Sequence, residues 1–268
     1  MQFRQQALSK LQSPEELDLP VRFARPQGRL VLLVTVLVMA AASFWAVTGS
    51  LSSTIDAPGI LTHAQGSYVL QSPVEGQVTG VFAQEGATLA ANAPLLKVRT
   101  PQGDRIVRAI AAGRLTSLSA TIGSVIATGA GVASVERTGG PDDPLVVMLY
   151  VPGDSAAGVP VGAPVDLAVQ TVPAERYGVL RGTVAAVGRT VQTPRQIAAF
   201  LGDNQLAEQF SRDGMPVAVL VRLDRTQATK SGYRWSSGQG PPYAVDSMTP
   251  ATGTVHLADR RPLDWLLP

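Results

Sequence analysis

The sequence predicts a mainly β protein that follows a single N-terminal transmembrane helix. Three observations support this fold class. One long uncharged segment lies near the N-terminus, short apolar runs separated by glycine and proline fill the remainder, and a gapless internal repeat occupies part of that remainder. The 26 glycines and 20 prolines among 268 residues suit short strands and tight turns. We therefore expect a membrane-anchored chain whose folded part consists of strands.

The predicted membrane span is the uncharged segment from Leu30 to Val47. It contains 18 residues, of which only Thr35 and Ser43 are polar. As a helix it would be about 27 Å long, close to the roughly 30 Å of a bilayer's hydrocarbon core. A cleaved signal peptide fits less well, because the basic segment before it is long. We predict a transmembrane helix over residues 30–48, whose lipid-facing side chains include Leu30, Leu33, Leu37, Phe44 and Trp45.

The distribution of charge predicts the orientation of this span. Five basic residues precede it, and the next one after Arg29 is Lys97. The positive-inside rule then places leader residues 1–29 in the cytoplasm and residues 49–268 outside, in a single-pass protein of the cytoplasmic (inner) membrane. Ser13, Pro14 and Glu16 form a capping-box pattern that predicts a short helix in the leader, with a solvated tail as the alternative.

Composition excludes several classes of function. Residues 30–268 contain 17 basic and 17 acidic residues, so no nucleic-acid-binding surface is expected. The absence of cysteine excludes a disulfide scaffold, a thiol nucleophile and a Cys-ligated metal. The only histidines, His63 and His256, are expected to be ordinary strand or loop residues. No Walker A, HExxH or G-x-S-x-G motif occurs. We expect no enzymatic activity, no catalytic residue, no metal and no cofactor.

An internal repeat organises the first part of the external chain. A shift of 37 residues aligns 73–98 with 110–135 without a gap. Gly76 then coincides with Gly113, and Gly86 with Gly123, and apolar positions also match. Each unit has the pattern of short strands joined by tight turns, and one unit alone could not bury a face. The repeat predicts a two-fold sandwich, with chance similarity in a chain rich in alanine, glycine and valine as the alternative.

Residues 66–137 resemble the biotinyl/lipoyl hammerhead, whose halves are strand repeats of this kind. Members that carry a cofactor attach it to a lysine in the turn between the halves. The corresponding turn here includes Arg99, Gln102, Gly103 and Arg105 but no lysine, and Lys97 falls in the preceding strand. The resemblance therefore implies a lipoyl-like domain that serves as a structural or binding module.

The remaining strands predict a split β-barrel. Strands expected within residues 49–65 would pair with those of domain 138–268, which makes the lipoyl-like domain an insertion. We also expect a helix near 194–211, with Thr193 and Pro194 at its start. The aromatic residues of a Gly/Ser-rich loop, Tyr233, Trp235 and Tyr243, are candidates for an exposed contact surface, and Trp235 could equally close one end of the barrel. The barrel strands are expected at 145–151, 165–169, 179–187, 217–223 and 254–257.

This order of parts resembles the membrane fusion proteins (periplasmic adaptors) of the HlyD type. Many of these have a long coiled-coil hairpin between the lipoyl halves, which a linker as short as 99–105 could not form. Narrower stretches resemble the HlyD-family secretion proteins of NHLM-type (nitrile hydratase leader microcin) bacteriocin export systems. Tyr150–Val165 and Glu175–Val184 carry the resemblance to the barrel motifs of the HlyD type, and the stretches that carry the narrower resemblance are Phe3–Glu15, Ser231–Pro242 and Arg261–Pro268.

The resemblance implies a non-enzymatic accessory subunit of an ABC-type peptide exporter. Its expected partners are an ABC transporter with ATPase domains and, in some systems, peptidase domains, a bacteriocin-like peptide cargo, the membrane, and further copies of the chain itself. These copies, for which a hexamer is one candidate, would line an exit path. A biotin-dependent carrier or enzyme would need the lysine that is missing. A membrane-anchored cell-envelope structural or wall-binding protein stays open as the alternative.

Overall fold

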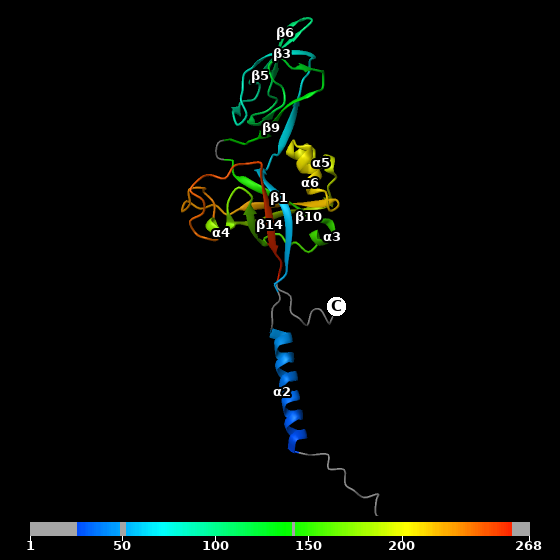
Figure 1. The fold of residues 1–268 in the computed structure, drawn as a ribbon, viewed down its shortest axis with the longest axis vertical. Coiled ribbons are helices and arrows are strands. Elements are labelled where there is room, and N and C mark those ends of the chain that lie inside the picture. The colour runs from blue at the N-terminus through cyan, green and yellow to red at the C-terminus, as the bar shows by residue number, and fades with distance from the viewer. Residues whose placement is uncertain (1–25, 49–51, 141–142, 259–268) are drawn as a thin grey trace, which may run out of the picture. The chain divides into compact units, whose positions relative to one another are not determined.

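The computed structural model describes residues 26–48, 52–140 and 143–258, which fall into two compact units. The first contains the helix α2 (Pro26–Thr48) (Figure 1). Its stretch Gly28–Thr48 is long and apolar enough to cross a membrane, with a mean hydropathy of 2.5. The predicted span lies inside α2, which begins four residues earlier. The capping-box pattern at Ser13 and the segment Arg261–Pro268 lie outside the described residues.

The second unit, Ser52–Asp259, contains a closed barrel. Strand β1 (Thr54–His63) pairs antiparallel with β10 (Leu145–Pro152) on one side and with β14 (Thr249–His256) on the other, so the first strand of this unit closes the barrel. The barrel is therefore assembled from segments about 80 residues apart in the chain. In spatial order its strands are β1 (Thr54–His63), β10 (Leu145–Pro152), β13 (Pro216–Leu223), β12 (Leu180–Val191), β11 (Pro164–Val169) and β14 (Thr249–His256).

The barrel core follows from alternation along these strands. Val219 and Val221 on β13 are fully buried, and Arg222 between Val221 and Leu223 is exposed. Aliphatic side chains dominate this interior, and burial of each contributes about 1.5–3 kcal/mol. A Cβ at Gly253 on β14 would overlap the buried Leu149 side chain, so a larger residue there would force Leu149 to move.

A two-sheet sandwich lies between β1 and β10 in the chain (Figure 1). The shift of 37 residues carries β3 (Gly76–Val81) onto β7 (Gly113–Leu118), β4 (Thr88–Leu89) onto β8 (Val125–Ile126), and β5 (Pro94–Thr100) onto β9 (Gly131–Arg137). It also relates the order of the strands in one sheet to the order in the other. The internal repeat is thus visible as a pseudo-two-fold relation between two sheets. One sheet is β2 (Ser67–Gln71), β9 (Gly131–Arg137), β7 (Gly113–Leu118) and β4 (Thr88–Leu89). The other is β6 (Gly103–Arg108), β5 (Pro94–Thr100), β3 (Gly76–Val81) and β8 (Val125–Ile126).

The four repeat glycines occupy equivalent places in the two sheets. Gly76 lies against the carbonyl of Arg99 so closely that a Cβ would overlap it, and Gly113 lies in the same way against the carbonyl of Glu136. Gly86 (φ +86°) and Gly123 (φ +95°) have the positive φ of tight turns. The two members of each pair therefore meet the same backbone requirement, one in each sheet.

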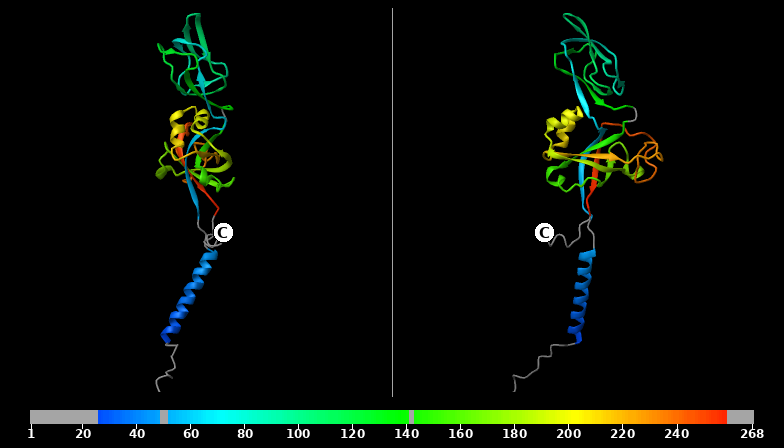
Figure 2. Two further views of the ribbon diagram at one scale, coloured as in Figure 1. Left: turned by 90° about the vertical axis from the view of Figure 1, so that its right-hand side faces the viewer. Right: turned by 180° about the vertical axis from the view of Figure 1, so that it is seen from behind.

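The single helix predicted near residues 194–211 is wrong, because the structure has two helices there. These are α5 (Pro194–Leu201) and α6 (Asn204–Phe210). Gly202 has a left-handed φ of +72° and ends α5, and the Asp203 side chain then accepts hydrogen bonds from two N–H groups of α6. Both helices lie on the outside of the barrel (Figure 2). Their apolar contact with β1 and β10 consists of Ile60, Tyr150, Ile197, Leu201, Ala207 and Phe210.

Two single-turn helices complete the second unit. They are α3 (Gly153–Ala156), which follows β10, and α4 (Ala174–Tyr177), which lies between β11 and β12.

Candidate functional site

The sandwich and the barrel meet at a joint built around Glu136 and His63. His63 is the last residue of β1, and Glu136 lies near the end of β9. The chain crosses between the two bodies twice in this region, between β1 and β2 and between β9 and β10. Contacts here therefore determine how the sandwich is held on the barrel.

Glu136 is fully buried, and partners from the barrel lie around one of its two carboxylate oxygens. Its Oε1 atom accepts hydrogen bonds from the Thr62 hydroxyl and from the His63 N–H, each at 3.0 Å. The same oxygen lies 3.0 Å from Nδ1 of His63, whose side chain is 13% exposed. A carboxylate without such partners would be very unfavourable in this position. The sandwich therefore contributes one buried charge to the joint, and the barrel supplies the groups that stabilise it.

The pKa shifts of the pair favour the charged form of both members. Burial raises the pKa of Glu136, but hydrogen bonds from His63 and Ser247 outweigh burial and leave it below its ordinary value. The hydrogen bond with Glu136 raises the pKa of His63, against burial and the positive charge of Arg114, while Asp143 adds to the increase. The joint thus contains a buried ion pair.

Two further polar contacts connect the sandwich with the segments around it. The Arg137 guanidinium donates to the carbonyl of Gln65, on the other chain crossing. Nη1 of Arg114, on β7, lies 3.4 Å from a carboxylate oxygen of Asp246, which precedes β14. Both groups of the second pair are largely exposed, so water and salt screen it and it contributes at most about 1 kcal/mol.

The end of helix α5 forms the third part of the joint. The Ser134 hydroxyl on β9 donates to the carbonyl of Gly202 at 3.0 Å. Gly66, with φ +66°, lies directly against Phe200, and a Cβ at Gly66 would overlap that ring. The C-terminal end of α5 therefore lies on the outward face of β2 and β9. Since α5 also packs on the barrel, it connects the sandwich with the barrel.

His63 is a strand residue, as expected, but sequence patterns do not show its buried partner 73 positions away. The repeat does contain a weak signal. Glu136 is equivalent to Arg99 under the 37-residue shift, and Arg99 is exposed. Since Glu136 and Arg99 are equivalent but carry opposite charges, the two repeat units differ in what they contact at this position.

The other histidine, His256, also has a partner. Its Nε2 lies 3.0 Å from Asp166, and the same carboxylate pairs with Arg181 on the neighbouring strand. Within the residues that the structure describes, no group of three or more His, Asp or Glu side chains is placed to hold a metal.

The predicted lipoyl-like turn is a tight hairpin between β5 and β6. Only Pro101 and Gln102 separate the two strands. The Thr100 hydroxyl accepts from the Gln102 N–H at 3.2 Å and donates to the carbonyl of Gly103 at 2.8 Å, which closes the turn. All residues from 101 to 106 are exposed. The nearest lysine, Lys97, lies within β5, where its Nζ pairs with Asp104 at 2.8 Å.

Trp235 is buried, so the expectation that it belongs to an exposed contact surface is wrong. Its side chain is 3% exposed within the barrel core, and its indole N–H donates to the Ser231 hydroxyl at 2.9 Å. Trp235 also bridges to Leu180 on β12, and Gly240 lies against the ring. The loop folds back to bury this large apolar side chain, as the alternative of barrel closure predicts.

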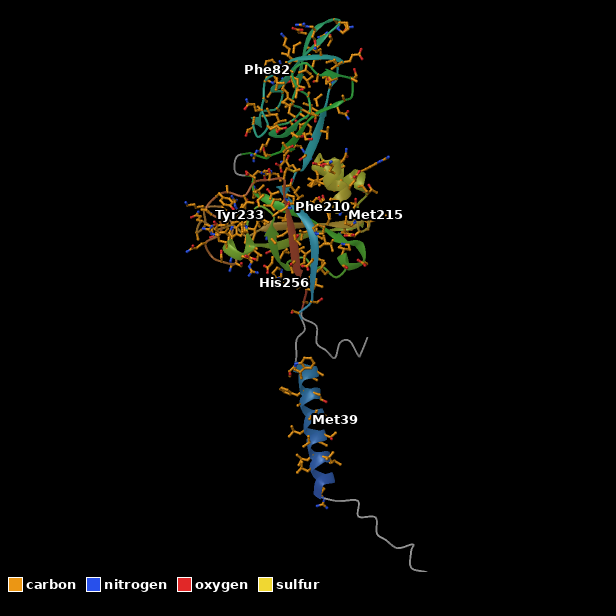
Figure 3. The ribbon with its side chains drawn as sticks, viewed as in Figure 1. Met39, Phe82, Phe210, Met215, Tyr233 and His256 are labelled. Carbon is orange, nitrogen blue, oxygen red and sulfur yellow. The ribbon has the colours of Figure 1, made fainter. Side chains whose placement is uncertain are left out.

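The two tyrosines of this loop differ from Trp235. The Tyr233 hydroxyl accepts from the Leu145 N–H at 3.1 Å, and its ring is half-buried against the barrel (Figure 3). Tyr243 is 44% exposed and meets the Tyr177 ring edge-on at 6.3 Å. Of the three predicted aromatic residues, Tyr243 alone is exposed.

The predicted lipid-facing residues are all exposed on α2, as Figure 3 illustrates for the neighbouring Met39. Their exposed fractions lie between 61% and 70%. A soluble protein would not leave such a continuous apolar surface uncovered. The residues are Leu30, Leu33, Leu37, Phe44 and Trp45.

No family model matches the sequence. Solved structures of membrane fusion, or periplasmic adaptor, proteins share the fold of this chain. MacA from Actinobacillus actinomycetemcomitans aligns with a TM-score of 0.53 and 8% identity, over 80% of this chain and 81% of MacA. ZneB from Cupriavidus metallidurans aligns with a TM-score of 0.51 and 10% identity, over 78% of this chain and 100% of ZneB. A MacA–MexA chimera that contains the α-hairpin domain of Pseudomonas aeruginosa MexA aligns with a TM-score of 0.50 and 9% identity, over 80% of this chain and 84% of the chimera.

Proposed function

We propose that this protein is the non-enzymatic adaptor subunit of an ABC-type peptide exporter in the cytoplasmic membrane. The observation that carries the proposal is the shared fold: a barrel with a two-sheet sandwich between its first two strands aligns with MacA and ZneB over about four fifths of this chain. The apolar helix α2 before the barrel supplies a membrane anchor. At 8–10% identity the comparison supports the fold alone, and we propose the role from fold and anchor together.

The cargo class is proposed from the sequence. The leader Phe3–Glu15 and the segments Ser231–Pro242 and Arg261–Pro268 resemble secretion proteins of NHLM-type bacteriocin systems. ATP hydrolysis and cleavage of the peptide leader would then belong to a partner transporter. The N-terminus would lie in the cytoplasm, because all basic residues before Lys97 precede the span.

The sandwich would serve as a structural, cofactor-free module. Its lipoyl-like turn presents no lysine, and the nearest one is paired with Asp104 within β5. The two-residue connection between β5 and β6 leaves no length for a helical hairpin. Copies of the chain arranged around an axis would line an exit path, and the buried joint at Glu136 would fix the direction in which each sandwich points.

Peptide secretion in the native host tests the proposal. Deletion of this chain should keep the peptide inside the cell while the partner ATPase stays in the membrane, and the full chain supplied in trans should restore export. Secretion that continues unchanged, with a defect confined to cell-wall integrity, would instead support a wall-binding or structural protein. A biotinyl or lipoyl adduct found by mass spectrometry would contradict the cofactor-free module.

A further inference from the structure

The outward face of the β5–β6 hairpin is the most basic part of the sandwich. Residues 94–108 contain four basic residues and one acid, whereas the rest of 66–137 contains two basic and three acidic residues. Cross-strand pairing places Lys97 beside Ile106, and Arg99 beside Asp104, on this outward face. Arg108 lies on the same side, two residues beyond Ile106, and is exposed. Three cations therefore lie around one apolar side chain that is 44% exposed. Asp104 on the same face pairs with Lys97 at 2.8 Å and lies 3.8 Å from Nε of Arg99, and Arg108 donates to the carbonyl of Asn92, so the face keeps a net positive charge.

The pseudo-two-fold relation identifies an equivalent face that is already occupied. In the other sheet, the C-terminal end of α5 lies on β2 and β9, where Ser134 bonds to Gly202 and Gly66 makes room for Phe200. A helix end is therefore known to fit on this type of face, within this same chain.

The shift of 37 residues maps the contacts of that helix onto the hairpin. Gly66 corresponds to Gly103, which also has a positive φ, of +114°. A Cβ at Gly103 would have no neighbour within 4 Å among the described residues, so the place that Phe200 fills in one half is open in the other. Ser134, which contacts the helix end, corresponds to Lys97. The hairpin face thus has a glycine at the position equivalent to Gly66, as the helix-binding face does, and Lys97 in place of the Ser134 hydroxyl.

We propose that this hairpin face binds the acidic C-terminal end of an α-helix from a partner protein. Lys97 is paired with Asp104, and it would exchange this pair for the free carbonyls and the negative dipole end of a helix C-terminus. Arg99 and Arg108 can pair with carboxylates of the helix, and Ile106 supplies the apolar contact between them. Figure 1 shows the hairpin at the end of the sandwich farthest from the barrel, where a partner can reach it.

A protein partner fits this face better than a lipid surface does. Membrane-surface segments combine basic residues with several large apolar or aromatic side chains. Residues 94–108 contain no aromatic residue, and their only exposed large apolar side chain is Ile106. The proposal adds a partner site to the adaptor role and does not depend on the peptide cargo.

Fluorescence anisotropy with a designed helix tests the proposal. The probe is a labelled amphipathic peptide with glutamates along its polar face and a leucine stripe opposite, and the full chain is used in detergent. A matched peptide has lysine in place of each glutamate. The hairpin variant is R99E/R108E, and the control R189E/R195E reverses two exposed arginines of the barrel and α5. The variant Ile106→Ser tests the apolar contact without a change of charge.

The proposal predicts that the glutamate helix binds and the lysine helix does not. R99E/R108E should weaken binding about tenfold or more, Ile106→Ser severalfold, and R189E/R195E not at all. Equal binding by R99E/R108E and wild-type protein would overturn the proposal. Binding to phosphatidylglycerol vesicles without binding to the peptide would also overturn it, because that result assigns the face to lipid. A change in the self-association of R99E/R108E, together with no binding of the peptide to the wild-type protein, would overturn it as well, because that result assigns the face to a second copy of the chain.

Discussion

The buried Glu136–His63 pair gives the sharpest prediction about stability, through the variant Glu136→Ala. The substitution removes a carboxylate that is fully buried and accepts from the Thr62 hydroxyl and the His63 N–H. Both donors would lose their partner, and His63 would lose its counter-charge.

Breaking a buried ion pair at one member costs about 3–5 kcal/mol. The lower end applies here, because His63 can release its proton once the carboxylate is gone. A loss of about 3 kcal/mol corresponds to a decrease in Tm of roughly 6–12 °C for a domain of this size.

Thermal unfolding of the full chain in detergent, followed by circular dichroism in the β region, measures this loss. The matched control is Arg99→Ala at the equivalent position of the other repeat unit, where the side chain is exposed and a change of no more than about 0.5 kcal/mol is expected. Equal Tm values for Glu136→Ala and wild-type protein, or equal decreases for both variants, would refute the reasoning that the joint depends on this pair.

Four further predictions follow from the same structure. The stability difference between wild-type protein and Glu136→Gln should be largest between about pH 4.5 and 6.5. It should shrink as pH rises through the raised pKa of His63 or falls through the lowered pKa of Glu136, and denaturant titrations that show no such maximum would contradict this. Leu37→Arg should reduce membrane yield, since a charge at mid-span costs about 2.5–3.5 kcal/mol; normal membrane recovery would argue against a single anchor. Replacing Gly66–Arg137 by a short flexible linker should leave a folded barrel, because His63 and Leu145 are register partners on β1 and β10, and loss of the remaining β signal would show one continuous fold. Trp235→Ala should cost about 3–5 kcal/mol in urea unfolding, against little for the exposed Tyr243→Ala, and similar small losses for both would disprove the core role of Trp235.

Local patterns in the sequence predict most of the strands, because each depends on its own residues. Short, mainly apolar runs identify β10 and β13, and the 37-residue repeat predicts the equivalence of the two sheets. The split barrel follows from the order of these runs, and the pairing of β1 with β10 agrees with it. The apolar helix α2 is predicted by length and composition alone.

Features that depend on distant contacts could not be predicted in this way. The break between α5 and α6 has a local cause, the Gly202–Asp203 pair, but the apolar spacing on both sides still suggests one helix. The burial of Trp235 depends on how a loop folds onto Leu180, 55 positions earlier in the chain. The joint at Glu136 joins residues 73 and 74 positions apart, and a single glutamate at a strand end is ordinarily exposed.

Affinity purification of the full chain from detergent-solubilised native membranes tests the adaptor role most directly. The proposed function predicts an ABC-type ATPase that is recovered at a fixed ratio to this chain and hydrolyses ATP in the purified complex. Recovery of the chain alone, or together with cell-wall material and no ATPase, would contradict it.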